Sequence, residues 1–143
     1  MDVLLISGLW LPASIWSDVV DALDELGHRP SPVPLPVVDH GSTTATLEDQ
    51  VEAVLAGIDR TGKPVVVGHS AACTLAWIAA DRRAAAISAV VLVGGFPASD
   101  GARYADFFPI AGSAMPFPGW EPFEGPDSAD LDEAARTRIA DGA

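Results

Sequence analysis

The sequence predicts an α/β protein with a doubly wound, mostly parallel sheet of about four strands. Short apolar segments that do not alternate with polar residues, typical of buried parallel strands, recur along the first hundred positions. Segments with apolar residues at helical spacing separate them, so strands and helices alternate. With 143 residues, 49% of them hydrophobic, the chain can form one domain with a substantial core.

The composition narrows the classes of partner and ligand. A formal net charge of −12 disfavours a nucleic-acid backbone or an anionic membrane as a partner, and a solvated acidic surface is sufficient to explain it. The single cysteine excludes an internal disulfide, and the sequence has no Cys and His set for a metal. We therefore expect no metal, no cofactor and a reducing, cytoplasmic location.

The N-terminus predicts a buried strand at residues 3–7, followed by a turn. Asp2 precedes this apolar run and no Lys or Arg does, which is unlike the start of a signal peptide. No apolar run in the sequence approaches the length of a membrane span.

Three helices are expected between the strands. The first begins near Ser14, ends at Gly27, and has an apolar face of Ile15, Val19, Ala22, Leu23 and Leu26. The second ends at Gly62 and has an apolar face of Leu47, Val51, Val54, Leu55 and Ile58. The third runs to about Arg82, and a fourth strand is predicted at residues 87–93.

Four prolines predict that residues 31–38 form an outer strand. They occupy even positions only: Pro30, Pro32, Pro34 and Pro36. Because alternate residues of a strand direct their N–H groups to the same side, the prolines remove donors from one edge and leave the other intact. This pattern is typical of an edge strand whose free side is protected from pairing.

The sequence around Ser70 predicts a strand, a sharp turn and a helix. Val65, Val66 and Val67 lead into Gly68-His69-Ser70-Ala71-Ala72, a Gly-x-Ser-x-Ala form of the nucleophile elbow. The turn brings strand and helix together, so the residues two before and two after the serine must be small. An ordinary Gly-Ser turn in an α/β unit is the alternative interpretation.

The composition changes near residue 99, so we divide the chain into a core at 1–98 and a lid-like segment at 99–143. Residues 107–126 combine several aromatic residues with five prolines, and a last helix is expected at about 130–140. Such a segment either packs as a loop on its own domain or begins a lid over a pocket.

In this order and spacing, these segments resemble the α/β-hydrolases, in particular the group of plant methylesterases and hydroxynitrile lyases. The resemblance covers roughly the first hundred positions and rests on Ser7-Gly8-Leu9-Trp10, Trp16, Leu26-Gly27-His28, Gly68-His69-Ser70-Ala71-Ala72 and Val93-Gly94-Gly95-Phe96-Pro97. It implies that Ser70 is the nucleophile and that the backbone N–H groups of Leu9 and Ala71 form the oxyanion hole. Ser7 departs from the family's usual histidine, which puts the geometry of the hole in question.

The family's acid and histidine base follow the serine in the chain, but no histidine follows Ser70 here. His28 is expected at a helix end, and the turn should direct the His69 side chain away from Ser70. His40, after the second strand, is the only candidate base in the chain, and Asp100 is expected in the first turn of the lid. The sequence therefore predicts the N-terminal part of a hydrolase that is nearly inactive alone.

The fourth predicted strand, from Ile87 to Val93, also indicates that part of the fold is missing from this chain. In the family's strand order it lies at the edge opposite the prolines, with no proline or charge to protect it. Either the natural protein continues, or another chain covers this edge, for instance a second copy in a homodimer.

Four functions follow from these observations. The first is a serine hydrolase acting on a carboxylester or similar acyl compound, with an apolar small-molecule substrate. The others are a lyase or non-catalytic ligand binder on the same site, a nucleotide-binding domain, and a short assembly protein that pairs through its exposed strand. The nucleotide class is disfavoured because the first turn has one glycine and a bulky tryptophan, and no phosphate-binding loop is present.

Overall fold

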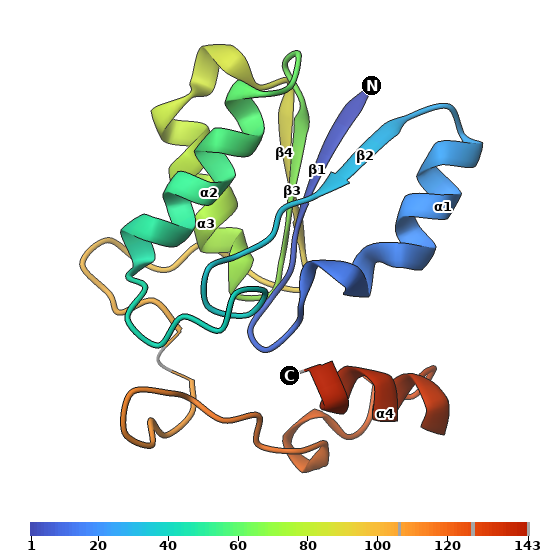
Figure 1. Ribbon diagram of the computed structural model, residues 1–143, viewed down its shortest axis with the longest axis vertical. Coiled ribbons are helices and arrows are strands. Elements are labelled where there is room, and N and C mark those ends of the chain that lie inside the picture. Colours follow the sequence, from blue (N-terminus) through green and yellow to red (C-terminus); the bar gives the residue numbers. More distant parts are fainter. Residues whose placement is uncertain (106, 127, 143) are drawn as a thin grey trace.

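The computed structural model, which describes residues 1–105, 107–126 and 128–142, contains a parallel sheet between two layers of helices. The strands are β1 (Asp2–Ile6), β2 (Arg29–Pro32), β3 (Val65–His69) and β4 (Ala89–Val93), in the order β2-β1-β3-β4. The helices are α1 (Ser17–Glu25), α2 (Leu47–Asp59), α3 (Ala72–Arg82) and α4 (Glu133–Gly142), with short 3-10 turns at Ala13–Trp16, Ala84–Ala86 and Glu121–Phe123. Helices α2 and α3 cover one face of the sheet and α1 lies on the other (Figure 1).

The core lies between β1, β3 and the helices α2 and α3. The apolar face predicted for α2 is confirmed, because Val51, Val54, Leu55 and Ile58 are all buried in one cluster with Leu4, Ile6, Val66 and Leu75. Thr46 precedes this helix, and its hydroxyl and the Asp49 carboxylate form a reciprocal capping box. The helix ends at Asp59 rather than at the predicted Gly62, and Arg60 is its cap.

Strand β2 is an outer strand, as predicted, but it occupies residues 29–32 rather than 31–38. The N–H groups of Arg29 and Val33 donate to the carbonyls of Met1 (2.8 Å) and Leu5 (2.9 Å), so the odd residues face β1. Pro30 and Pro32 consequently face the free edge. The pairing stops here because β1 ends at Ile6, and a strand extended to residue 38 would have no partner.

The predicted apolar face of α1 is wrong in part. Val19 and Leu26 are exposed, at 39% and 72%, whereas Val20 and Leu23 are half-buried. The chain enters α1 through a 3-10 turn with three residues per turn, which rotates the following residues relative to a continuous α-helix. Gly27 ends the helix at φ 78°, as predicted.

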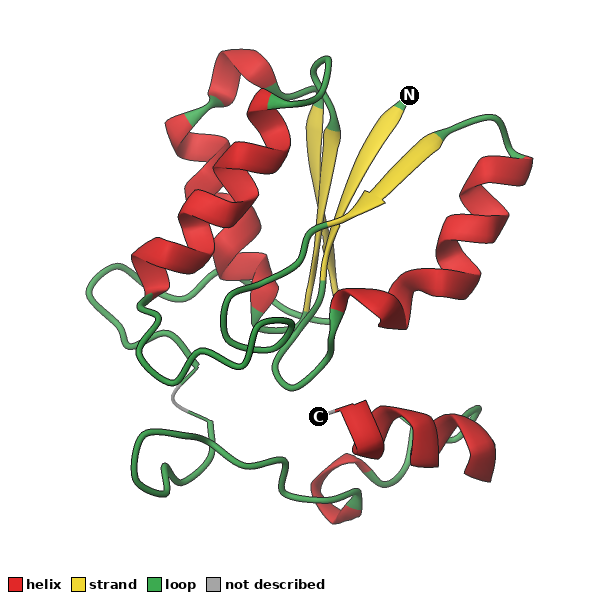
Figure 2. Cartoon of the chain, in the orientation of Figure 1, coloured by secondary structure: helices red, strands yellow, loops and turns green. Residues whose placement is uncertain are grey.

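The last two predicted elements begin later than expected. Strand β4 starts at Ala89 rather than at residue 87, because a 3-10 turn at Ala84–Ala86 precedes it, and it lies at the edge of the sheet. Helix α4 starts at Glu133 rather than near 130 and has no buried residue among those described. The segment before α4 is largely loop and lies below the carboxyl ends of the strands in Figure 2.

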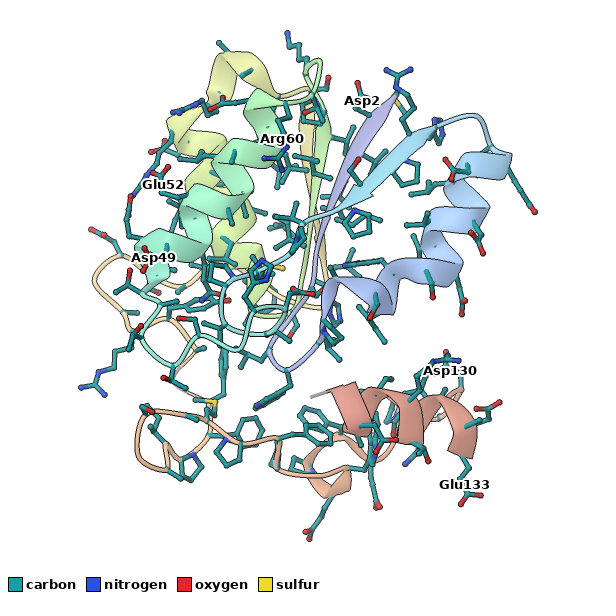
Figure 3. The ribbon with its side chains drawn as sticks, viewed as in Figure 1. Asp2, Asp49, Glu52, Arg60, Asp130 and Glu133 are labelled. Carbon is teal, nitrogen blue, oxygen red and sulfur yellow. The ribbon has the colours of Figure 1, made fainter. Side chains whose placement is uncertain are left out.

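The acidic character of the sequence is a surface property in the structure. Asp49 and Glu52 on α2 and Glu133 on α4 are exposed and point away from the core (Figure 3). In the described part of the chain, no group of three or more acidic, His or Cys side chains is arranged to hold a metal ion. Over the same residues, none of the helices has both the length and the apolarity that a membrane crossing requires.

Candidate active site

Ser70 lies at the apex of the turn between β3 and α3, as the sequence predicts. Its φ is 54°, a left-handed conformation that is rare for residues other than glycine. Its N–H donates to the carbonyl of Val93 (2.8 Å), and its carbonyl accepts from the N–H of Cys73 (3.0 Å). The end of β4 and the first turn of α3 therefore hold the strained residue in place.

The turn brings strand and helix into close contact, which explains the small residues around Ser70. A Cβ atom on Gly68 would lie 2.6 Å from the carbonyl oxygen of Ala72 and 2.9 Å from the Cβ of Ala76. A Cβ on Gly95 would lie 2.5 Å from the Ser70 carbonyl oxygen. The need for a small residue at position 68 was predicted, whereas the need at position 95 arises from a contact distant in sequence.

The loop at residues 7–12 lies directly against the turn at Ser70. A Cβ on Gly8 would lie 3.0 Å from the Ser70 Cβ and 3.1 Å from the His69 Nδ1. Within residues 1–105, 107–126 and 128–142, no hydrogen bond engages the backbone N–H of Leu9 or of Ala71. Among those residues, both N–H groups therefore lack a hydrogen-bond partner.

A cavity of about 620 Å³ opens beside Ser70. Its lining includes both residues predicted for the oxyanion hole, Leu9 and Ala71. Most of the remaining wall is apolar or aromatic and includes Phe96, Tyr104, Phe107, Phe108 and Phe123. Among the described residues that line it, Arg103 is the only one with a charged side chain. The site can therefore hold an apolar small molecule next to the serine hydroxyl.

The aromatic segment after residue 106 forms one side of this cavity. Trp10 donates its Nε1–H to the carbonyl of Met115 (2.8 Å) and contacts the rings of Phe108, Phe117 and Phe123 at centroid distances of 5.4, 5.7 and 6.1 Å. The segment is therefore packed on the loop at residues 7–12, which follows β1. The segment therefore packs as a loop on its own domain and also lines the pocket, whereas its role as the start of a lid stays a prediction.

None of the three histidines lines the cavity. His69 packs edge-on against Trp16, with ring centroids 6.2 Å apart, and burial lowers the pKa of its imidazole. His40 is exposed in the turn that follows β2, and His28 lies just beyond α1. Asp100, exposed in a turn after β4, also lies outside the lining.

Sequence reasoning missed two residues beside Ser70. The Thr74 hydroxyl accepts from the N–H of Ala98 (2.8 Å) and ties the segment after β4 to the start of α3. Tyr104 packs against the core, and burial raises the pKa of its hydroxyl. Thr74 follows Ser70 by four residues and could have been found from helical spacing, but nothing in the sequence places Tyr104 at this site.

Comparisons with known proteins agree with this architecture. A sequence model of the alpha/beta hydrolase family matches residues 3–143. No curated protein matches the sequence.

The similar solved structures have low sequence identity and show a common fold. An extracellular alpha/beta-hydrolase from a Paenibacillus species is 24% identical, with a TM-score of 0.68 over 76% of this chain and 46% of that chain. Polyneuridine aldehyde esterase is 22% identical (TM-score 0.61; 67% and 40% covered). A pyrethroid hydrolase from Sphingobium faniae is 21% identical (TM-score 0.56; 64% and 38% covered). The chain thus spans less than half the length of these relatives.

Proposed function

The chain belongs to the alpha/beta hydrolase family, and from that premise we propose that it carries the nucleophile half of a serine hydrolase site. Ser70 attacks the carbonyl carbon of an ester or similar acyl compound, and the N–H groups of Leu9 and Ala71 bind the oxygen as it becomes negative. The observation that carries this proposal is the left-handed Ser70 at a strand-to-helix turn, on the wall of a cavity. Strained backbone conformations of this kind are concentrated at active sites, which supports a catalytic role for the serine.

The proposed reaction needs a base to take the proton from the Ser70 hydroxyl, and an acid to orient that base. No histidine follows Ser70 in the sequence, and the described lining of the cavity contains none. We therefore assign the base and the acid to a part of the active protein outside these 143 residues. Removal of the base alone costs such a triad about 10⁶ in kcat, so the chain by itself should be nearly inactive.

The walls of the cavity support an apolar substrate. Aromatic rings line the cavity beside the serine, and a ring or alkyl group bound there would be removed from water. Cys73 is buried with a free thiol, which fits the reducing, cytoplasmic location that forms part of the same proposal.

A fluorophosphonate probe tests the role of Ser70. We expect slow labelling at Ser70 in the isolated chain and rapid labelling in a protein that supplies the base, located by peptide mass analysis. Ser70→Ala should abolish the labelling. Ser99→Ala is the matched control, because Ser99 lines the same cavity, and it should label as the wild type does. Labelling that persists in Ser70→Ala would exclude Ser70 as the nucleophile.

A second candidate function is a lyase or a ligand binder on the same site, and the missing base favours the non-catalytic binder of these two, because a lyase needs a base as well. An apolar cavity beside a serine can bind a small molecule without turning it over. Turnover of aryl esters would indicate a hydrolase, and turnover of cyanohydrins would indicate a lyase. Binding of either compound in calorimetry, without turnover, would indicate a ligand binder. Binding without turnover in a protein that supplies the base would favour the non-catalytic function.

A further inference from the structure

Trp10 has an unusual backbone conformation next to the candidate oxyanion hole. Its φ is 63°, in the left-handed region that residues with a large side chain rarely adopt. The neighbouring loop contributes few restraints of its own: Leu11 N–H donates to the Gly8 carbonyl at 3.3 Å, and the Ser7 hydroxyl donates to the Pro12 carbonyl at 3.2 Å. The conformation at residue 10 must therefore be maintained by contacts from elsewhere in the chain.

Those contacts come from the aromatic segment about a hundred residues later. The indole N–H of Trp10 is bound to the Met115 carbonyl (2.8 Å), and three phenylalanine rings of the same segment meet the indole at interplanar angles of 62° to 71°. Phe117 in turn stacks on Phe123 and meets Trp120 edge-on. The indole is thus one point at which the aromatic cluster is attached to the loop after β1.

Leu9 lies between two fixed points. On one side Gly8 abuts the Cβ of Ser70, and on the other Trp10 is held by the aromatic cluster. Since no hydrogen bond among the described residues engages the backbone N–H of Leu9, rotation at residue 10 would redirect that group. The distance between that N–H and an oxygen bound at Ser70 consequently depends on the packing of the Trp10 indole.

We propose that Trp10 is a positioning residue that couples docking of the aromatic segment to completion of the oxyanion hole. The proposal rests on the proposed function, since it assigns the Leu9 N–H to that hole. When the segment is docked, residue 10 is held left-handed and the Leu9 N–H faces the site. When it undocks, the backbone at residue 10 relaxes and the hole loses one of its two donors.

The lining of the cavity offers a variant that weakens the packing on Trp10 from outside the cavity wall. Phe117 contacts the indole but is not among the residues that line the cavity, whereas Phe108 and Phe123 do both. Phe117→Ala therefore weakens docking without touching a bound substrate. Ile110→Ala is its matched control, because Ile110 belongs to the same segment, is 61% exposed and lies outside both the cluster and the lining.

Two measurements on the chain test the proposal. Amide exchange followed by NMR should show Leu11 N–H and the Trp10 indole N–H exchanging about fivefold faster in Phe117→Ala, which corresponds to the loss of the aromatic pair between Phe117 and Trp10. In a fluorophosphonate assay, the maximal rate of labelling at Ser70 should fall about tenfold while the concentration for half-maximal rate stays unchanged. Trp10→Phe should shift both readouts in the same direction, because it keeps a ring but loses the N–H donor.

Ile110→Ala, and Trp77→Phe on the exposed face of α3, should leave both readouts at wild-type values. Unchanged exchange at Leu11 in both Phe117→Ala and Trp10→Phe would overturn the coupling. Faster exchange at Leu11 with an unchanged labelling rate would overturn the link to the oxyanion hole. Absence of labelling in a wild-type protein that supplies the base would instead refute the proposed function, and the exchange measurement on the chain would still decide the coupling.

Discussion

Gly68 is the residue on which the geometry of the turn depends most directly. Its hydrogen faces the first turn of α3, and a methyl group there would overlap the Ala72 carbonyl at 2.6 Å. Gly68→Ala should therefore lower the free energy of unfolding by about 2 kcal/mol, because strand and helix must separate to accommodate it. Urea denaturation measures the change. Gly62→Ala is the control, since its added Cβ would lie 3.7 Å from the nearest atom, and an equal loss in both variants would refute the steric argument.

His69 gives the fold a predictable pH dependence. Burial lowers the pKa of its imidazole below the ordinary value of 6.5, so the unfolded chain binds a proton more readily than the folded one. The stability contributed by neutral His69 is fully present above about pH 6.5 and is lost as the pH falls from there through the lowered folded pKa. The melting temperature should fall over this interval in the wild type.

His69→Gln is the comparison for that measurement, because the amide is uncharged at every pH. The difference in melting temperature between wild type and variant should shrink as the pH falls below 6.5. A difference that is constant with pH would mean that His69 titrates alike in the folded and unfolded chains.

At the residue scale, the sequence predicts those conformations that depend on steric contacts between residues close together in the chain. Ser70 between Gly68 and Ala72 satisfies the requirement of a tight turn within five positions, and the structure has that turn. Trp10 and Tyr104 could not be assigned, because their environments come from segments far along the chain. The hydrogen bond from Trp10 to Met115 spans 105 positions, and no local pattern encodes it.

The N-terminus of α2 offers a test at the scale of an element. Thr46 and Asp49 satisfy each other's backbone N–H groups, with the Asp49 carboxylate 2.7 Å from the Thr46 N. Thr46→Ala should lower the free energy of unfolding by about 1 kcal/mol. The N–H of Asp49 loses its acceptor, the Thr46 hydroxyl, and the Asp49 carboxylate is no longer aligned by that hydroxyl to accept from the N–H of residue 46. Thr44→Ala, exposed in the loop before the helix, should change the stability little in the same denaturation experiment. Equal effects would indicate that the capping box is not formed in solution.

Elements that depend on one periodic pattern were predicted well, and those that depend on their neighbours were not. The apolar face of α2 is correct because the helix is long and its face meets the core directly. The face of α1 was misplaced because the preceding 3-10 turn shifts the helical phase, which spacing alone does not reveal. Strand β2 was placed too late because its end is determined by the length of β1.

At the scale of the whole molecule, the unprotected side of β4 remains the feature most open to association. The strand pairs only with β3 among the described residues, and Val91 and Val93 remain 44% and 42% exposed. The opposite edge differs, because Pro30 and Pro32 face outward there. Asymmetry of this kind directs any strand addition to β4.

The chain is therefore expected to pair through β4, and the partner available in a pure sample is a second copy. Light scattering at tens of micromolar, an order of magnitude suited to modest interfaces, should give twice the chain mass of 14.8 kDa. Val91→Lys should return the mass to that of one chain, because a charged side chain on an edge strand opposes pairing. Val19→Lys is the matched control: Val19 is similarly exposed, at 39%, but lies on α1, so this variant should remain a dimer. A wild-type chain that stays monomeric, with the β4 amides that face away from β3 exchanging as freely as loop amides, would contradict pairing between copies. Slow exchange of these edge amides in a longer protein that runs as a single chain would instead indicate that another segment of the same polypeptide covers the edge.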